Sequence, residues 1–509
     1  MKTDIDRPGL RSAKILTLVA FVKKFVAKWL NLAEYSRGPA IASFLLFVVT
    51  FFVIRTTRDV GIGIGDFANG ISHLAPLVFS TAVELATTWL LLVFIHALFA
   101  FLRSEITLGR NLNNSESYLF SALVCFYLTV PILINSIFDI PEAFPISIVF
   151  PVALVVMVLA VFIGARAALV MAIALPVASY MLGTYNSFSF IIAVISGMAA
   201  SVALQGAQKR MEIIRAGLVI AATNCLAVSV YLLLLRASIG VYPVLLFLAI
   251  LNGVVSGMLL LGILPPLEQA LNAITPFRLI ELSDLNAPVF RKFFTTAPGT
   301  YSHSMMVATL AEQACTDIGA NALLARVGAY YHDIGKMENP DYFIENQTDH
   351  NKHDDIAPRL SVTVIRSHVK LGTEKARSLK LPKAVIEIVQ EHHGNSLVSF
   401  FYNKAVEQGE SVNPEDFQYP GSPPKSRESA VVMLADVTEA AVRTLAKPTA
   451  AKIDKFIAGL FDAKVEEGQL AKSELTFREL KIIRGAFVKV LASYYHARIE
   501  YPNQENPAG

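Results

Sequence analysis

Eight of the ten histidines in this 509-residue chain follow residue 300. A bound metal is the usual reason for such a concentration, because neutral imidazole is the commonest metal ligand among side chains. Aspartates accompany the histidines in the pair His332-Asp333 and at Asp436, which lies in an apolar stretch where a carboxylate needs a partner. Arg443 is the alternative partner for Asp436 if no metal binds there.

These candidate ligands include no thiolate. The three cysteines are far apart and two lie in apolar runs, so they predict neither a disulfide framework nor a thiolate cluster. Imidazole and carboxylate suit Mn, Fe or Zn, and one carboxylate can bridge two ions about 3.5–4 Å apart. Such a pair can hold a bridging hydroxide and offset charge on a phosphate, so the pattern favours phosphodiester hydrolysis with Asp333 as the bridge.

Helices must bring these residues together. Apolar periodicity and turn residues predict five helices that each carry or end at a candidate ligand. They are a helix over 304–316 opened by His303, one over 322–331 closed by His332-Asp333 before Gly335, one starting at 355–358 with His368 at its far end, one from Pro382 to His392-His393-Gly394, and one over 429–445 with Asp436.

The part of the chain before the histidine-rich region has the composition of a segment that lies in lipid and not in water. The chain is 54% hydrophobic and only 17% charged, and the uncharged runs fill residues 38–265. A membrane span needs about 20 apolar residues, and this rule predicts eight helical spans in a lipid bilayer. They lie near 38–54, 75–102, 117–138, 145–164, 166–183, 187–206, 213–235 and 240–265.

Lysine and arginine set the predicted orientation, since positive charge is retained in the cytoplasm. Eight of them lie in the basic N-terminal segment 1–37, and the loops on the same side of the membrane carry six more, against three on the opposite side. We therefore expect a multi-pass protein of the cell (inner) membrane, with both termini and the histidine-rich region in the cytoplasm.

Other function classes are disfavoured. A net charge of +3 without any block of like charges does not suggest a partner among nucleic-acid polymers. Glu84 and His96 lie inside the second predicted span, where ionisable groups are costly, but they reveal neither a sensing nor a transport role. Asn224, Asn252 and the Gly253-to-Gly257 spacing are interpreted as helix-packing features.

Longer stretches carry a family resemblance. Together, His303, His332-Asp333 and Asp436 resemble the signature of the HD superfamily. The chain as a whole resembles the seven-transmembrane receptor HD family through five segments: Ala297-Pro-Gly-Thr-Tyr-Ser-His303-Ser, Leu324-Ala-Arg-Val-Gly-Ala-Tyr-Tyr-His332-Asp-Ile-Gly-Lys336, Phe343-Ile-Glu-Asn-Gln347, His392-His-Gly-Asn-Ser-Leu-Val398 and Arg498-Ile-Glu-Tyr-Pro502.

The resemblance implies an all-helical HD domain that hydrolyses cyclic di-AMP to the linear dinucleotide pApA. It further implies two divalent metal ions, with Mn or Fe favoured over Zn, and a homodimer is a further expectation. The first ion would be held by His303, His332, Asp333 and Asp436, and the second by Asp333, His368, His392 and His393. Lys336 would contact a substrate phosphate, although a solvated surface lysine is the alternative. His350 and His353 lie in a polar loop and are left out of the ligand set.

The predicted organisation is all-α throughout. It comprises the basic segment 1–37, a polytopic membrane domain 38–265, a connecting segment 266–290, the HD phosphodiesterase domain 291–502 and a tail 503–509. The chain departs from the family in one place, because only about twenty residues, 55–74, replace the usual large extracellular domain. Alternative functions are a cyclic di-GMP phosphodiesterase, whose Gly-Tyr-Pro motif is missing after His393, and a catalytically silent HD receptor.

Overall fold

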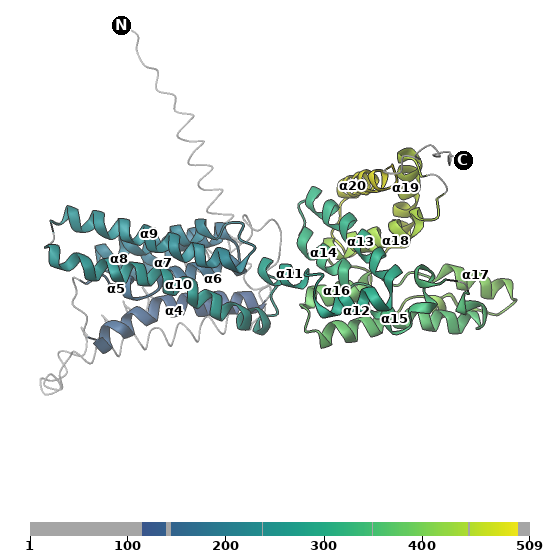
Figure 1. Cartoon of the computed structure of the whole chain (residues 1–509), viewed down its shortest axis with the longest axis horizontal. Helices are drawn as coiled ribbons and strands as arrows, with labels where there is room; N and C mark the ends of the chain where they lie inside the picture. Colours follow the sequence, from purple (N-terminus) through teal and green to yellow (C-terminus); the bar gives the residue numbers. More distant parts are fainter. Residues whose placement is uncertain (1–113, 139–143, 237, 349, 446–447, 497–509) are drawn as a thin grey trace, which may run out of the picture. The chain divides into compact units, whose positions relative to one another are not determined.

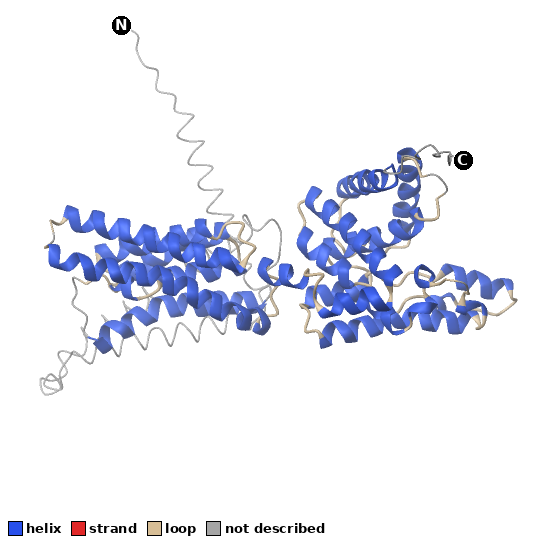
Figure 2. Ribbon diagram, in the orientation of Figure 1, coloured by secondary structure: helices blue, strands red, loops and turns tan. Residues whose placement is uncertain are grey.

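The computed structural model describes residues 114–138, 144–236, 238–348, 350–445 and 448–496. The chain divides into two compact units between Ala273 and Ile274, a position inside the predicted connecting segment. We call them the N-terminal unit and the C-terminal unit. Every regular element in the described ranges is a helix (Figure 2), and for them the all-α prediction is confirmed. The segment 1–37, the predicted spans 38–54 and 75–102, Glu84 and His96 lie outside the described residues.

Helices make up the described part of the N-terminal unit (Figure 1). Within it, three segments are long and apolar enough to span a bilayer, namely Glu116–Asn135, Arg210–Leu234 and Ile239–Ala270, and three further apolar helices are shorter. The helices are α4 (Asn114–Phe138), α5 (Ile146–Val149), α6 (Val152–Phe162), α7 (Ala165–Met181), α8 (Ser187–Ala203), α9 (Arg210–Leu234) and α10 (Tyr242–Ala270), the last preceded by the 3₁₀ turn η4 (Ile239–Val241).

The predicted span over 145–164 is not one continuous helix, because the chain breaks there into α5 and α6. Pro151 lacks a backbone N–H and disfavours helical geometry at the residue before it, and Phe150 is extended, with φ −78° and ψ 126°. The side chain of Asn252 in α10 lies against the break. Its Nδ2 donates to the carbonyl oxygens of Ile148 at 3.0 Å and Phe150 at 2.9 Å. The broken backbone is thereby satisfied inside the unit.

Close backbone contact joins α9 and α10. A Cβ added to Gly253 would lie 2.3 Å from the backbone nitrogen of Ala221, and one added to Gly257 would lie 3.1 Å from Cα of Gly217. Asn224 of α9 donates to the Asn252 side chain across the same interface, at 3.3 Å. The small residues and both asparagines therefore pack the helices together, as predicted.

The C-terminal unit is a helical domain with one continuous apolar core. In it α13 packs on α14, α18 and α20, while α15 packs on α16 and α17 (Figure 1). Its helices are α11 (Pro276–Leu282), α12 (Pro288–Thr296), α13 (Pro298–Asp317), α14 (Ala322–Tyr331), α15 (Pro358–Ser378), α16 (Lys383–Glu391), α17 (Ser399–Glu407), α18 (Arg427–Val442), α19 (Ala450–Glu466) and α20 (Phe477–His496).

Short 3₁₀ turns connect these helices near the predicted site. They are η5 (Ile334–Glu338), η6 (Pro340–Tyr342), η7 (Ile344–Asn346), η8 (Lys352–Asp354) and η9 (Pro414–Phe417). The segment between α16 and α18 has a small core of its own, in which Phe401 and Phe417 pack with Val362 of α15. The Val398 amide donates to the Phe417 carbonyl at 2.9 Å, so both ends of this segment are held together.

Candidate metal centre

The histidine of α13 lies further inside its helix than predicted. The helix starts at Pro298 and not at Ser304, because proline is favoured in a first turn where its missing N–H is not needed. His303 therefore occupies the second turn and is buried, with 4% of its surface exposed. Gly299 allows the start of α13 to approach η7, since a Cβ at this position would lie 1.8 Å from the carbonyl oxygen of Glu345.

The end of α14 places the central carboxylate. As predicted, α14 ends at Tyr331, with His332 as its C-cap and Asp333 at the start of η5. A Cβ at Gly335 would lie 2.0 Å from the carbonyl oxygen of His368, so only glycine lets η5 approach α15 this closely. The prediction that His368 ends its helix is wrong, because α15 runs from Pro358 to Ser378 and carries His368 near its middle.

Two further elements complete the set. Helix α16 ends at Glu391, His392 caps it, and Gly394 adopts a φ of +54°, so both histidines of the doublet can turn toward one site. Asp436 lies within α18 and is 7% exposed. It does not pair with Arg443, the alternative partner, because Arg443 bonds Glu439 at 2.5 Å instead.

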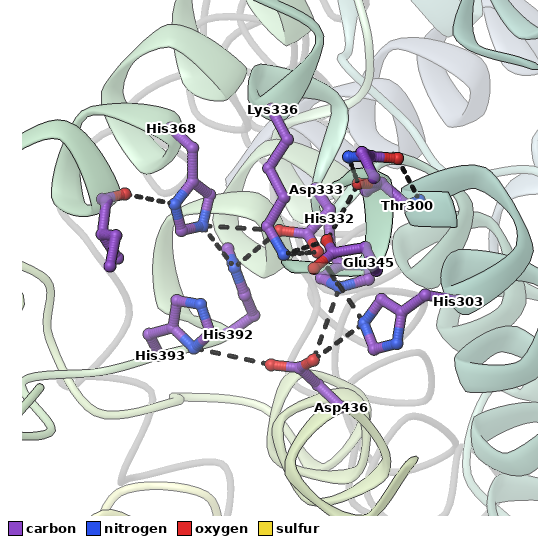
Figure 3. Close-up of polar contacts among 12 residues, drawn as sticks. Thr300, His303, His332, Asp333, Lys336, Glu345, His368, His392, His393 and Asp436 are labelled. Carbon is purple, nitrogen blue, oxygen red and sulfur yellow. Dashed lines mark hydrogen bonds and ion pairs between the residues drawn. The ribbon is translucent and has the colours of Figure 1, made fainter. Parts of the chain in front are cut away.

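The structure brings all seven predicted ligands into one cluster (Figure 3). Two groups in it could each hold an ion, with ligand atoms within 4.8 Å of one another, and Asp333 belongs to both. Its Oδ2 lies 3.2 Å from Nε2 of His332 and 3.7 Å from Nε2 of His303. Its Oδ1 lies 3.4 Å from Nε2 of His368 and 3.6 Å from Nε2 of His392. One carboxylate oxygen thus faces each group.

Asp436 lies outside these two groups but faces both of them. Its Oδ1 is 3.0 Å from Nε2 of His303 and 3.8 Å from Nε2 of His332, and its Oδ2 is 3.5 Å from Nδ1 of His393. Bonds of about 2.0–2.2 Å to a common ion place neighbouring ligand atoms about 3 Å or more apart. The separations in the cluster match that requirement.

Backbone carbonyls fix which imidazole nitrogen faces the cluster. The Nδ1 atoms of His332, His368 and His392 lie 2.7, 2.5 and 2.8 Å from carbonyl oxygens three residues earlier in the chain. A carbonyl can only accept, so each Nδ1 carries a proton and donates it, which leaves Nε2 as the atom able to bind a cation. Nε2 of His368 and Nε2 of His392 face each other at 3.2 Å, an arrangement that a cation bound by both atoms would stabilise.

Two ligand atoms are buried without any hydrogen-bond partner. These are Nε2 of His332 and Oδ1 of Asp333. Leaving a buried polar group unsatisfied costs about 1–3 kcal/mol, and more for a charged group. A metal ion coordinated by these atoms would remove that cost, so the donor set fits divalent metal binding.

Similarity to known proteins agrees with this geometry. Residues 79–275 match the family described as 7TM receptor with intracellular HD hydrolase, and residues 300–441, which contain all seven ligands, match the HD domain. The chain is similar to this receptor family over both regions. Its N-terminal unit is accordingly the membrane domain of a membrane protein, and its C-terminal unit contains the HD domain.

Curated relatives include two proteins named cyclic-di-AMP phosphodiesterase PgpH. The one from Bacillus subtilis is 37% identical over 76% of this chain and 56% of its own length, and the one from Listeria monocytogenes is 36% identical over 71% and 51%. The chain thus spans about half the length of these relatives. A crystal structure of the L. monocytogenes PgpH HD domain in complex with cyclic-di-AMP is also similar. The two sequences are 44% identical, the match covers 42% of this chain and 100% of the crystallised chain, and the TM-score is 0.40.

The electrostatics of the HD domain favour positive charge at the cluster. Burial acts to raise the pKa of Asp333, but Lys336 and His332 outweigh it and hold that pKa well below its usual value. Burial acts to lower the pKa of His332, but Asp333 and Asp436 outweigh it and raise the pKa to about 10. Burial lowers the pKa of His368 to about 3. The carboxylates therefore stay ionised and His368 stays neutral, as metal ligands must.

Lys336 is not a solvated surface residue. Its side chain is 13% exposed, and its Nζ lies 2.7 Å from Oδ2 of Asp333 and 3.0 Å from Oε1 of Glu345. The surface alternative is wrong because Gly335 draws η5 against α15 and turns Lys336 inward (Figure 3). The ammonium group therefore lies directly beside the predicted bridging carboxylate.

Three residues near the cluster were not predicted. Glu439 accepts from Nδ1 of His303 and also binds Arg443. Glu345 accepts from Lys336 and, at 2.9 Å, from the Thr300 hydroxyl. Tyr419 stacks on the His393 ring, with centroids 4.3 Å apart. Glu439 follows Asp436 by three residues on one helix, a spacing that could have indicated a shared face. The other two approach only through tertiary packing.

A cavity of about 760 Å³ opens at the cluster. Its volume lies within the range of sites that enclose a small organic ligand. His303, Lys336, His368, His392, His393 and Asp436 contribute to its lining. Of the two histidines left out of the ligand set, His350 is exposed and pairs with Asp355, whereas His353 is buried and lines the cavity at a distance from the ligand groups.

Proposed function

We propose that this chain is a membrane-bound, metal-dependent phosphodiesterase that hydrolyses cyclic di-AMP to pApA and so lowers the level of a second messenger. The observation that carries the proposal is Asp333, whose two carboxylate oxygens each face a separate group of imidazole nitrogens. The names of the relatives from B. subtilis and L. monocytogenes support the choice of substrate. The cavity supports it too, because it has room for a small ligand beside the ligand atoms.

The residues divide between two divalent ions, with Mn or Fe preferred to Zn. His303, His332, Asp333 and Asp436 would hold the first ion, and Asp333, His368, His392 and His393 would hold the second. When bound, such a pair supplies a nucleophile at neutral pH and offsets negative charge on the phosphate oxygens. Nitrogen and oxygen ligands without thiolate are consistent with these metals.

The remaining groups position the reactants. Lys336 would bind a phosphate oxygen of the substrate, since its ammonium group is close to Asp333 and lines the cavity. Glu439 would hold the His303 ring through Nδ1 and direct Nε2 toward the site, in the way that carboxylates orient metal-binding histidines. Glu345 keeps Lys336 in place and is itself fixed by Thr300.

We also propose that the HD domain and both termini lie in the cytoplasm. The distribution of lysine and arginine supports this orientation, with eight such residues in segment 1–37 and only three in the loops predicted on the opposite side. A single cysteine placed after residue 503 of a cysteine-free variant tests it. It should react with an impermeant maleimide only after the cells are opened.

The direct test of the activity uses the purified full-length chain in detergent. After removal of bound metal, Mn²⁺ or Fe²⁺ should restore hydrolysis of cyclic di-AMP, with pApA as the product seen by chromatography. Cyclic di-GMP, compared at equal concentration, should be cleaved more slowly. His350→Ala is the matched histidine control, because this side chain is 62% exposed and should leave the rate unchanged. Failure to cleave either dinucleotide with any divalent metal would support the silent-receptor alternative.

A further inference from the structure

His393 is the histidine of the cluster whose own ring contacts hold it least. The other four ligand histidines each have a hydrogen bond to the ring nitrogen that faces away from the ligand groups. Among the described residues, the His393 ring has stacking on Tyr419 and a 3.5 Å approach to Asp436, but no such bond. Its side chain is 24% exposed, more than any other predicted ligand. The direction of this ring therefore depends on the backbone that carries it.

The backbone after His393 forms a tightly enclosed turn. Gly394 has a φ of +54°, and the Ser396 amide donates to the His393 carbonyl at 3.1 Å. A Cβ at Gly394 would lie 2.1 Å from Oε1 of Gln469, and a Cβ at Gly421 would lie 2.5 Å from the Gly394 carbonyl oxygen. The turn is thus packed between the segment before α18 and the residue Gln469, which follows α19.

The side chain of Gln469 is bonded to this turn at both of its polar atoms. Its Nε2 donates to Oδ1 of Asn395 at 2.8 Å, and its Oε1 accepts from the Asn395 amide at 3.4 Å. Gln469 is only 2% exposed, so a shift of the turn would leave a buried amide group unsatisfied. Lys464 of α19 adds a third bond, from Nζ to Oγ of Ser396 at 2.9 Å.

The end of α19 holds Gln469 itself in place. Its backbone amide donates to the Lys464 carbonyl at 3.1 Å, and Gly468 before it has a φ of +69°, which turns the chain back at the end of the helix. Leu470 after it packs against the main core of the domain. The amide of Gln469 is therefore a fixed support, and the turn beside His393 rests on it.

We propose that Gln469 is a positioning residue for His393, which holds the turn 394–396 and thereby directs the His393 ring toward the metal centre. The inference rests on the proposed function, because it requires an ion at His393. Partners of metal-binding histidines usually bond the ring directly. Here the support acts through the backbone and comes from a residue 74 positions after Asn395. Helix α19 thus contributes to the centre although it carries no predicted ligand.

The test measures Mn²⁺ affinity by calorimetry on the metal-free, full-length protein in detergent. Gln469→Leu keeps the size of the side chain without its hydrogen bonds, and affinity should fall by about tenfold or more. Gln469→Glu should keep most of the affinity, because its oxygens can still accept from the amide groups of Asn395. Gln313→Leu is the matched control, since Gln313 bonds Asp317 of its own helix and lies outside the cavity lining.

A second background separates positioning from general stability. In His393→Ala the ligand that Gln469 directs is missing, so adding Gln469→Leu should change Mn²⁺ affinity by about twofold or less. A loss of stability alone would act equally in both backgrounds. Asn395→Ala provides the same comparison if Gln469→Leu does not fold, because Asn395 is exposed and its substitution removes the 2.8 Å bond.

The outcomes distinguish this inference from the proposed activity. Unchanged Mn²⁺ affinity in the folded variants, or an equal loss with and without His393, would overturn the role of Gln469 and leave the activity standing. A protein that shows the dependence on His393 but hydrolyses no cyclic dinucleotide would contradict the proposed activity and retain Gln469 as a positioning residue.

Discussion

Both units contain a helix that breaks, and they use the break in opposite ways. Between α5 and α6 the freed carbonyls of Ile148 and Phe150 are bonded by Asn252, so the polar groups are satisfied inside the membrane domain. Between α14 and η5 the break directs His332 and Asp333 inward, and two of their ligand atoms have no hydrogen-bond partner. The first break is therefore stabilised by hydrogen bonds within the unit, whereas the second leaves ligand atoms that can bind a cation. Unsatisfied polar atoms indicate a cation site at the second break because they belong to neighbouring imidazole and carboxylate groups.

Loss of the carboxylate at the second break should have the largest effect. Asp333→Ala removes the group that both ligand sets share, so we expect hydrolysis of cyclic di-AMP to fall by about 1,000-fold or more. The measurement is the initial rate with saturating Mn²⁺, together with the metal content of the protein. Glu84→Gln, which changes the membrane domain, should retain the wild-type rate. A normal rate for Asp333→Ala would show that this carboxylate does not bridge two ions.

Removing the partner of a ligand should have a smaller effect. Glu439→Gln weakens the hold on Nδ1 of His303 but leaves every predicted ligand in place, so we expect Mn²⁺ affinity to fall by about 10- to 100-fold. Calorimetric titration of the metal-free protein measures it. Glu387→Gln on α16 is a control, because this carboxylate pairs with Lys383 and lies outside the cavity lining. Equal affinities for Glu439→Gln and the wild type would reduce Glu439 to a packing residue.

The pH dependence of metal binding tests whether the groups at the second break, between α14 and η5, bind a cation. The pKa of His332 is raised to about 10, since its carboxylate neighbours outweigh the effect of burial, so the metal-free protein holds a proton there at neutral pH. Metal must displace this proton, and affinity should therefore rise with pH by about tenfold per unit for each proton released. Titrations at pH 6.5, 7.5 and 8.5 measure the slope. A flat profile would mean that no cluster proton competes with the metal.

A substitution at the break between α5 and α6 should lower the stability of the protein without changing its activity. Asn252→Ala leaves buried carbonyls without their donor, so we expect the free energy of unfolding to fall by about 1–3 kcal/mol, seen as a lower melting temperature in detergent. Below that temperature hydrolysis should change less than twofold. Thr223→Ala on α9 is the control, because its exposed hydroxyl bonds only its own helix. A folded Asn252 variant with no activity would contradict the separation between the two breaks.

Local signals predicted most helix boundaries and missed two by several residues, the start of α13 and the end of α15. Glycine marks a helix end through its backbone freedom, which is why the predicted ends at His332 and at His392-His393-Gly394 agree with α14 and α16. Proline is common in first helical turns, but the predicted helix began at Ser304 and left Pro298 outside it. The ten residues of α15 that follow His368 continue the helix with a polar face, which apolar periodicity does not reveal.

The partners of the predicted ligands could not be predicted. Whether Lys336 faces solvent or Asp333 depends on how closely η5 approaches α15, which is a property of the packed domain. Tyr419 stacks on His393, and its amide donates to the carbonyl of Ser396, more than twenty positions away in the sequence. Residue types and spacing thus indicate which chemistry is present, while the groups that orient it come from tertiary contacts.

The central claim is that two cations share Asp333. Crystals of the Mn²⁺-loaded protein, measured at the manganese absorption edge, test it most directly. The account predicts two anomalous peaks roughly 3.5–4 Å apart, one beside Oδ1 of Asp333 near His368 and His392, and the other beside Oδ2 near His303 and His332. A single peak, or none at this carboxylate, would contradict it.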